Sequence, residues 1–192
     1  MTMYLLDTNV LSNLGKQRPT QEVVDWCNRL ALRHWCIAQC SVMEIRRGIK
    51  LLYAKNDLRR GNECSEWFKG IMAMKPRVVP LDSNVMEVYT DLSVIPHLQD
   101  LFAPNPGRYP AKVGRDLEIA ATAIAIGAFV VTLNVKDFDR INRYRQLPGV
   151  FNPETGEWCV RPRKRSAIEA ADIDGPWDRH RKLGMKQLRG LQ

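Results

Sequence analysis

Short apolar runs alternate with segments of helical spacing along most of the chain. The run Tyr4–Leu6 is closed by polar turn residues, which predicts a buried strand. Segments between such runs place apolar residues three and four positions apart, as helices that cover a sheet do. Further strands are predicted at 35–40, 78–81 and 129–133, and helices at 22–32, from 41, from 83 and from 116. This alternation predicts an α/β fold with a parallel sheet.

Two regions interrupt this regular pattern. Prolines and a glycine divide residues 96–115, which predicts a long loop, and long loops in small domains often carry function. The alternation ends near residue 152, so we expect one domain over 1–152 and a basic C-terminal extension over 153–192. The basic cluster at 161–165 is either a site of phosphate contacts or part of a solvated tail.

Composition and charge narrow the classes of function. The length of 192 residues suits one domain with an appendage, and a net charge of +8 favours nucleic acid, an anionic membrane or an acidic partner. No apolar stretch is long enough for a transmembrane helix, and Asp7 interrupts the N-terminal run, so we expect no signal peptide, no membrane anchor and a cytoplasmic location. Five cysteines without a C-x-x-C pair argue against structural zinc.

Four acidic residues are expected at one edge of the sheet, where open parallel sheets bind their ligands. They follow strands or begin helices: Asp7, Glu44, Asp116 and Asp137. Converging carboxylates repel one another, and a divalent cation relieves this repulsion. Oxygen ligands without histidine or cysteine favour Mg²⁺ or Mn²⁺. Such a metal activates water and stabilises a phosphoryl group, which points to phosphodiester hydrolysis.

Each acid also has a purely structural interpretation. Ser41-x-x-Glu44 matches a capping box, and Asp116 suits a helix N-cap. Asp7 and Asp137 suit turns. Two other acidic residues are not assigned to the site. Asp82 follows a strand but is most simply a helix cap, and Glu118, two positions after Asp116, points to a different side of its helix.

Four segments resemble the successive motifs of PIN-domain ribonucleases, the toxins of VapBC toxin–antitoxin systems. They occur in the same order, and the resemblance covers roughly residues 1–152. The segments are 6–10 (LDTNV), 41–48 (SVMEIRRG), 116–123 (DLEIAATA) and 132–138 (TLNVKDF). The long loop at 96–115 and the extension after residue 152 depart from the family pattern.

The resemblance implies an α/β/α sandwich around a parallel sheet, with a Mg²⁺ or Mn²⁺ site that cleaves RNA. It also implies a homodimer and inhibition by a cognate VapB-like antitoxin. The first three site acids are then Asp7, Glu44 and Asp116, with Thr132 and Asn9 as supporting residues. Family members place a fourth acid either where Asn134 stands or where Asp137 stands. We assign it to Asp137, with Asn134 orienting that carboxylate or a metal-bound water.

The resulting hypothesis is an endoribonuclease in which a metal-bound water attacks the phosphodiester in line. The basic residues expected to guide the RNA, unless they only form a solvated face, are Arg46, Arg47, Lys50, Arg108, Lys112 and Arg115. One alternative is another metal-dependent phosphohydrolase, such as a haloacid-dehalogenase-like phosphatase, but Asp7-Thr8-Asn9 lacks its second acid. The other is a non-enzymatic receiver-like or RNA-binding module, and a receiver needs paired acids near the first strand.

Overall fold

A six-stranded, mostly parallel sheet forms the centre of the molecule, with strand order β3-β2-β1-β4-β5-β6. The computed structural model describes residues 3–102 and 115–162. The first five strands are parallel, and only β6 runs antiparallel to its neighbour β5. The strands are β1 (Tyr4–Leu6), β2 (Trp35–Ala38), β3 (Arg77–Val79), β4 (Phe129–Val131), β5 (Val150–Asn152) and β6 (Glu157–Val160).

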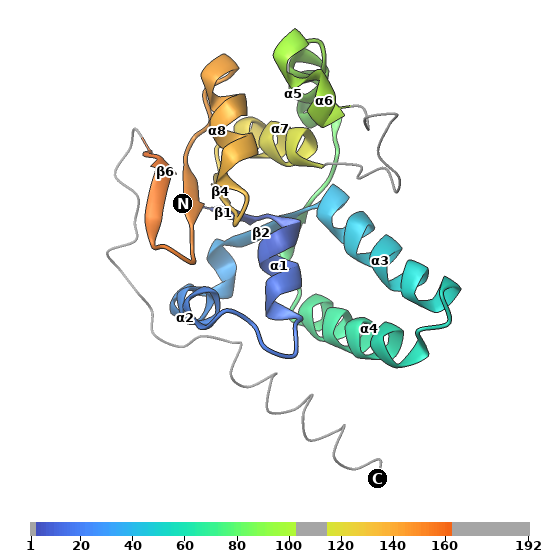
Figure 1. The fold of residues 1–192 in the computed structure, drawn as a ribbon. Coiled ribbons are helices and arrows are strands. Elements are labelled where there is room, and N and C mark those ends of the chain that lie inside the picture. Colours follow the sequence, from blue (N-terminus) through green and yellow to red (C-terminus); the bar gives the residue numbers. More distant parts are fainter. Residues whose placement is uncertain (1–2, 103–114, 163–192) are drawn as a thin grey trace.

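Helices cover both faces of the sheet (Figure 1). One face carries α1 (Thr8–Leu14), α2 (Gln21–Arg29), α3 (Gln39–Ala54) and α4 (Leu58–Ala73), and the other carries α5 (Ser83–Ser93), α6 (Gln99–Phe102), α7 (Asp116–Ile126) and α8 (Val135–Tyr144). Short 3-10 turns, η1 (Leu32–His34) and η2 (Pro96–Leu98), precede β2 and α6. The core consists of two clusters of buried apolar side chains, one on each face. The expected α/β/α sandwich is confirmed.

The alternation of side chains along β1 explains why both faces need cover. Leu5 points into one apolar cluster, whereas Tyr4 and Leu6 point into the other. All three residues are buried, as is usual in a parallel sheet with helices on both faces. Leu6 pairs with Ile37 of β2 and with Val131 of β4. The three strands therefore end in register, and the residues that follow them emerge at one edge.

Two helix starts decide between interpretations that the sequence left open. Helix α3 begins at Gln39, after Ala38 as its N-cap, so Ser41 already lies inside the helix. The capping-box interpretation of Ser41 and Glu44 is therefore wrong. Helix α5 confirms the expected cap, because the carboxylate of Asp82 accepts a hydrogen bond from the backbone N–H of Val85 at 3.0 Å.

Helix α7 has the buried character that its sequence predicts. Seven consecutive residues from Leu117 to Ala123 are buried, which matches the apolar composition of the segment. The helix ends at Gly127, whose φ of +66° lies in the left-handed region that glycine tolerates best. This turn returns the chain directly into β4.

The folded part extends past the boundary expected at residue 152. Strand β6 pairs with β5 beyond that point, so residues 157–160 belong to the sheet. Part of the expected loop at 96–115 is helical, because η2 and α6 occupy its first residues. Residues 103–114 and 163–192, which include most of the basic cluster at 161–165, lie outside the described residues. Among the helices that are described, none has the length and apolar character needed to cross a membrane.

Candidate active site

Asp7 lies at the centre of a polar network at the carboxyl edge of the sheet. It follows β1 directly and is only 3% exposed. Its Oδ2 accepts a hydrogen bond from the hydroxyl of Thr132 at 2.6 Å and another from the side-chain amide of Asn9 at 2.6 Å. Thr132 follows β4, the strand beside β1, and the backbone N–H of Asp7 donates to Val131 at 3.0 Å. The sheet register thus brings together residues 125 positions apart.

The two expected supporting residues bind each other as well as Asp7. The amide nitrogen of Asn9 also lies 3.1 Å from the Thr132 hydroxyl, and its amide oxygen accepts from the backbone N–H of Leu133 at 3.0 Å. The Thr132 hydroxyl in turn accepts from the backbone N–H of Asn134 at 2.9 Å. Together these bonds fasten the start of α1 to the turn after β4, which leaves the Asp7 carboxylate little freedom to move.

Asn134 links two further acids, Asp116 and Asp137, to this network. Its side-chain amide donates to Oδ2 of Asp137 at 2.6 Å and lies 3.3 Å from Oδ2 of Asp116. Asn134 is the N-cap residue of α8, but its side chain makes no capping bond. Asp137 stands in the first turn of α8, which begins at Val135. The structure therefore places Asn134 between two carboxylates that the sequence separates by a whole strand.

Glu44 approaches the site from α3. It is half-buried, and its charge is one of the factors that raise the pKa of Asp7. Burial is the main cause and brings the pKa of Asp7 to about 6, whereas the hydrogen bond from Thr132 lowers it. The edge of the sheet thus concentrates negative charge that its own hydrogen bonds compensate only in part.

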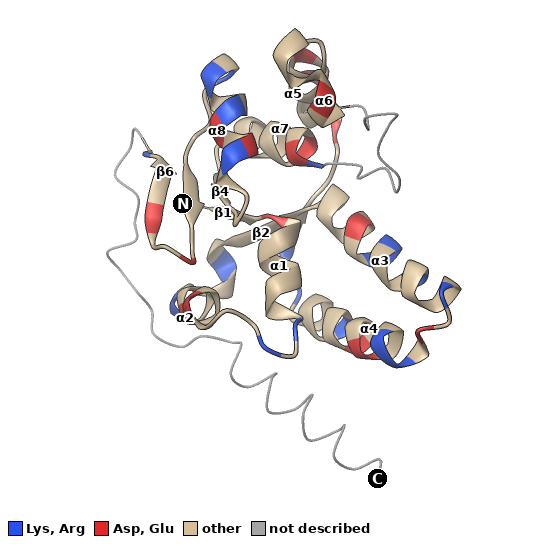
Figure 2. Ribbon diagram, viewed as in Figure 1, with Lys and Arg blue, Asp and Glu red and all other residues tan. Residues whose placement is uncertain are grey.

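The donor atoms at this edge suit a hard divalent cation. Figure 2 shows acidic segments on α3, on α7 and where β1 meets α1. All the candidate ligands are carboxylate or amide oxygens, the type that Mg²⁺ and Mn²⁺ prefer. Over residues 3–102 and 115–162, however, no three acidic, histidine or cysteine side chains gather closely enough to form a complete metal-binding group. Hydrogen bonds from the side-chain amide of Asn134 stabilise the carboxylates of Asp116 and Asp137.

The basic residues expected to guide RNA fall into three groups. Arg46, Arg47 and Lys50 are exposed on α3, and the guanidinium of Arg46 lies 5.9 Å from the centre of the Phe68 ring. Arg115 is half-buried and forms an ion pair with Glu118 at 2.6 Å. Arg108 and Lys112 lie outside the described residues. The side chains on α3 are therefore the ones whose exposure suits contact with a phosphate backbone.

A groove beside the acidic edge was not predicted from the sequence. It has a volume of about 380 Å³, and α1, α3 and α4 contribute its walls. Thr8 and Glu44 line it near the acids, whereas Gly48 and Trp67 line it farther along. Helix α4 itself had not been predicted. Its buried residues Gly61, Phe68 and Ile71 leave most of the helix surface polar, so the apolar signal in the sequence is weak.

Comparisons with known proteins find relatives that are named a ribonuclease and a toxin. The chain is 30% identical to the VapC ribonuclease Y4jK of Sinorhizobium fredii over 139 residues, which are 71% of this chain and 91% of that relative. It is 29% identical to the toxin FitB of Neisseria gonorrhoeae, over 79% of this chain and 98% of that relative. The structure of FitAB bound to an IR36 DNA fragment is similar with a TM-score of 0.57 and 28% identity, over 79% of this chain and 96% of that chain. No protein-family model matches the sequence.

Proposed function

This chain belongs to the family of VapC ribonuclease toxins, and on that premise we propose that it is an endoribonuclease that acts as the toxin of a toxin–antitoxin pair. Its reaction is the hydrolysis of RNA phosphodiester bonds. The overall excess of positive charge, +8, suits a polyanionic substrate. A receiver-like module or a haloacid-dehalogenase-like phosphatase is not favoured, because the two relatives, matched over 91% and 98% of their own length, are named a VapC ribonuclease and a toxin.

The observation that carries this proposal is the network that links the acids at the edge of the sheet. Hydrogen bonds run from Asp7 through Thr132 to Asn134 and from there to Asp116 and Asp137. Such a chain of bonds holds carboxylates at fixed positions, which is what positioning a scissile phosphate requires. These acids can take up the proton that an attacking water loses.

We assign the metal to the same residues. Asp7, Glu44, Asp116 and Asp137 would hold Mg²⁺ or Mn²⁺, with Asn134 beside them, and the bound ion supplies charge stabilisation for the phosphoryl group and activation of water. Thr132 and Asn9 keep the Asp7 carboxylate pointed at the site. The exposed Arg47 and Lys50 on α3 would hold the RNA backbone through its phosphates.

The partner that fits this site is an antitoxin protein. FitAB, the similar complex, contains a related toxin with its partner. In this chain the groove between α1, α3 and α4 reaches the acidic edge at Glu44, so a segment lying in the groove would end beside the acids. A positively charged side chain there would be attracted to the carboxylates and would block the substrate. The homodimer expected from the resemblance stays a prediction.

Cleavage of RNA by purified protein, freed of any partner, tests the proposed activity. We expect cleavage with Mg²⁺ or Mn²⁺ that stops on addition of a chelator. Asp7→Asn should lower the rate by about a hundredfold or more if the acid binds the metal. Asp82→Asn is the matched control, because Asp82 only caps α5 and asparagine caps helices equally well. Cleavage that survives both the chelator and Asp7→Asn would contradict the proposal.

A further inference from the structure

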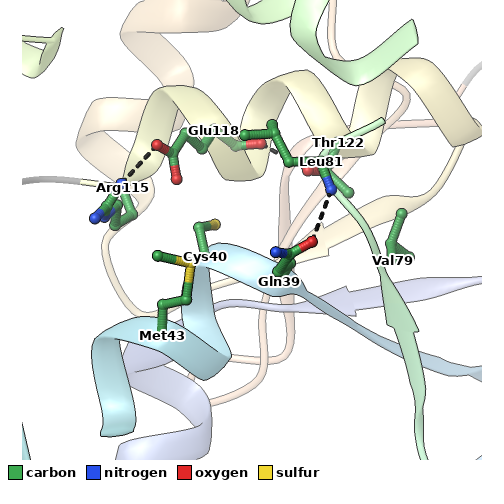
Figure 3. Close-up of a pocket in the computed structure, with 8 residues that line it drawn as sticks. All are labelled: Gln39, Cys40, Met43, Val79, Leu81, Arg115, Glu118 and Thr122. Carbon is green, nitrogen blue, oxygen red and sulfur yellow. Dashed lines mark hydrogen bonds and ion pairs between the residues drawn. The ribbon is translucent and has the colours of Figure 1, made fainter. Parts of the chain in front are cut away.

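A small pocket lies beside the acidic edge and shares none of its four candidate acids. It has a volume of about 80 Å³ and opens where β2 and β3 end, whereas Asp7 and Thr132 follow β1 and β4. Gln39 at the start of α3 and Leu81 after β3 line it, together with Arg115 and Glu118 at the start of α7 (Figure 3). Asp116 lies between the last two in the sequence, so the pocket and the acidic edge are adjacent.

The pocket presents one hydrogen-bond donor and one acceptor toward the same space. The amide oxygen of Gln39 accepts from the backbone N–H of Leu81 at 3.1 Å, which leaves the amide nitrogen turned to the pocket. One carboxylate oxygen of Glu118 pairs with Arg115 at 2.6 Å, and Figure 3 shows the other pointing toward Cys40 and the pocket, where burial and a hydrogen bond with Glu118 raise the pKa of the Cys40 thiol. A carboxylate oxygen can accept more than one hydrogen bond, so a ligand that donates to Glu118 would add to the bonds from Arg115 and Cys40.

The rim of the pocket is apolar and open to solvent. The side chains of Met43 and Leu81 are 52% and 40% exposed, although both are large hydrophobic residues. The volume of about 80 Å³ exceeds the ~10–15 Å³ that one water needs and is about half of the ~150 Å³ cavity that holds benzene. The pocket therefore admits the edge of a flat ring whose remainder stays at the open rim, and a whole nucleotide does not fit.

We propose that this pocket binds one unpaired nucleobase of the RNA substrate, next to the bond that is cut. A nucleobase has two apolar faces for Met43 and Leu81, and an edge with a donor beside an acceptor for Glu118 and Gln39. Neighbouring strands lie ~4.8 Å apart, so a base at the ends of β2 and β3 belongs to a nucleotide at or near the phosphodiester that is cut at the acidic edge. The inference rests on the proposed ribonuclease function.

Such a pocket would make cleavage dependent on one base. Phosphate contacts hold any RNA equally, whereas contacts to a base edge distinguish sequences. A base fixed between α3 and α7 determines which phosphodiester bond reaches Asp116. The cut should therefore show a strong base preference at one position and weak preferences elsewhere.

Binding can be tested without any cleavage. Protein labelled with ¹³C at the methionine methyl groups is titrated with each of the four uncharged ribonucleosides in the presence of a chelator. We expect at least one of them to shift the Met43 methyl signal in a saturable manner and to leave Met86, an exposed methionine on α5, unchanged. The shift should be lost in Gln39→Glu, which keeps the acceptor for Leu81 but replaces the donor amide. No saturable shift at Met43 with any nucleoside would overturn the proposal.

The second measurement reads the base preference. An RNA library with a randomised segment is cleaved and the product ends are sequenced. Gln39→Glu should reduce the preference at one position about tenfold, the upper scale of one net hydrogen bond between neutral groups. Met43→Ala should reduce the same preference by removing an apolar contact. Two variants serve as controls: Gln146→Glu, an equal charge change at an exposed residue, and Leu51→Ala, a change at another exposed apolar residue on α3. Unaltered preference in Gln39→Glu would refute the pocket, whereas absence of cleavage in the wild type would refute the nuclease activity instead.

Discussion

At the scale of single residues, Asp7 combines burial with unusual electrostatics. Its carboxylate is enclosed at the end of β1 and accepts bonds from Thr132 and Asn9. Burial disfavours the charged form more than these bonds favour it, so the pKa is raised from 3.8 to about 6. Its ionised form therefore destabilises the metal-free fold, and perturbed pKa values of this kind are common at functional sites.

The pH dependence of stability follows from this raised pKa. The folded state retains the proton of Asp7 up to about pH 6, whereas the unfolded chain releases it near 3.8, so the contribution to stability is present below 3.8 and lost as pH rises through 6. In chelator, Asp7→Asn should raise the free energy of unfolding at pH 7.5 by on the order of 2 kcal/mol and have little effect near pH 3.5. Chemical denaturation at both pH values measures this, and Asp82→Asn should show no such gain. Equal effects at both pH values would contradict the assignment.

A second residue-scale prediction concerns the fourth acid. A carboxylate can bind a divalent cation and accept a proton, whereas the amide of Asn134 carries no charge. Asp137→Asn should therefore lower cleavage and Mn²⁺ affinity more than Asn134→Ala, which only removes the amide that orients Asp116 and Asp137. Both variants are compared as folded protein. Near-native activity in Asp137→Asn together with an inactive Asn134→Ala would make Asn134 the completing ligand.

At the scale of elements, two glycines show that backbone conformation determines whether a glycine-to-alanine substitution stabilises or destabilises the fold. A Cβ at either Gly127 or Gly48 would meet nothing within 4 Å, so packing does not distinguish them. Gly127 has a φ of +66°, whereas Gly48 lies inside α3. Gly127→Ala should lower the free energy of unfolding by about 1–2 kcal/mol, because alanine is strained in the left-handed region. Gly48→Ala should raise the free energy of unfolding by about 0.5–1 kcal/mol, because alanine favours the helix. Thermal or urea unfolding should therefore show changes of opposite sign in the free energy of unfolding for the two variants. Changes of the same sign would contradict the helix assignment.

The groove between α1, α3 and α4 allows a test of the antitoxin interaction. Gly48 lines this groove, so Gly48→Phe should fill it and weaken binding of the antitoxin at least tenfold while RNA cleavage persists. Gly70 on α4 also has open space around it but does not line the groove, which makes Gly70→Phe the matched control. Co-expression with the cognate antitoxin should rescue growth for Gly70→Phe and not for Gly48→Phe. Rescue of both variants would place the antitoxin elsewhere.

At the scale of the whole molecule, the C-terminal extension can be tested for contacts with the phosphates of RNA. Because β6 belongs to the sheet, a truncation after residue 153 would remove a strand, and the cut has to follow Pro162 instead. If residues 163–192 contact phosphates, their removal should weaken RNA binding and reduce the slope of log affinity against log salt by roughly 0.7 per lost contact. Binding measured at several salt concentrations decides this. An unchanged slope would make the segment a solvated tail.

The sequence by itself determined the fold class and the identity of the candidate acids. Apolar runs such as Tyr4–Leu6 and the apolar α7 can only be buried, and this local requirement fixes the alternation of strands and helices. Four short motifs in order, around Asp7, Glu44, Asp116 and Asp137, together indicated the family. Boundaries were less accurate, because α3 begins at Gln39 and β6 continues the sheet, and both depend on pairing with distant segments.

Only the tertiary structure decided how the acids are connected and what lies beside them. Thr132 reaches Asp7 because β4 pairs with β1 in register, and no local pattern encodes this register. The groove at Gly48 and the pocket at Gln39 arise where helices from separate parts of the chain meet, so their shapes depend on packing. Residue types and their spacing identify candidate chemistry, whereas the distances between side chains follow from the fold of the whole domain.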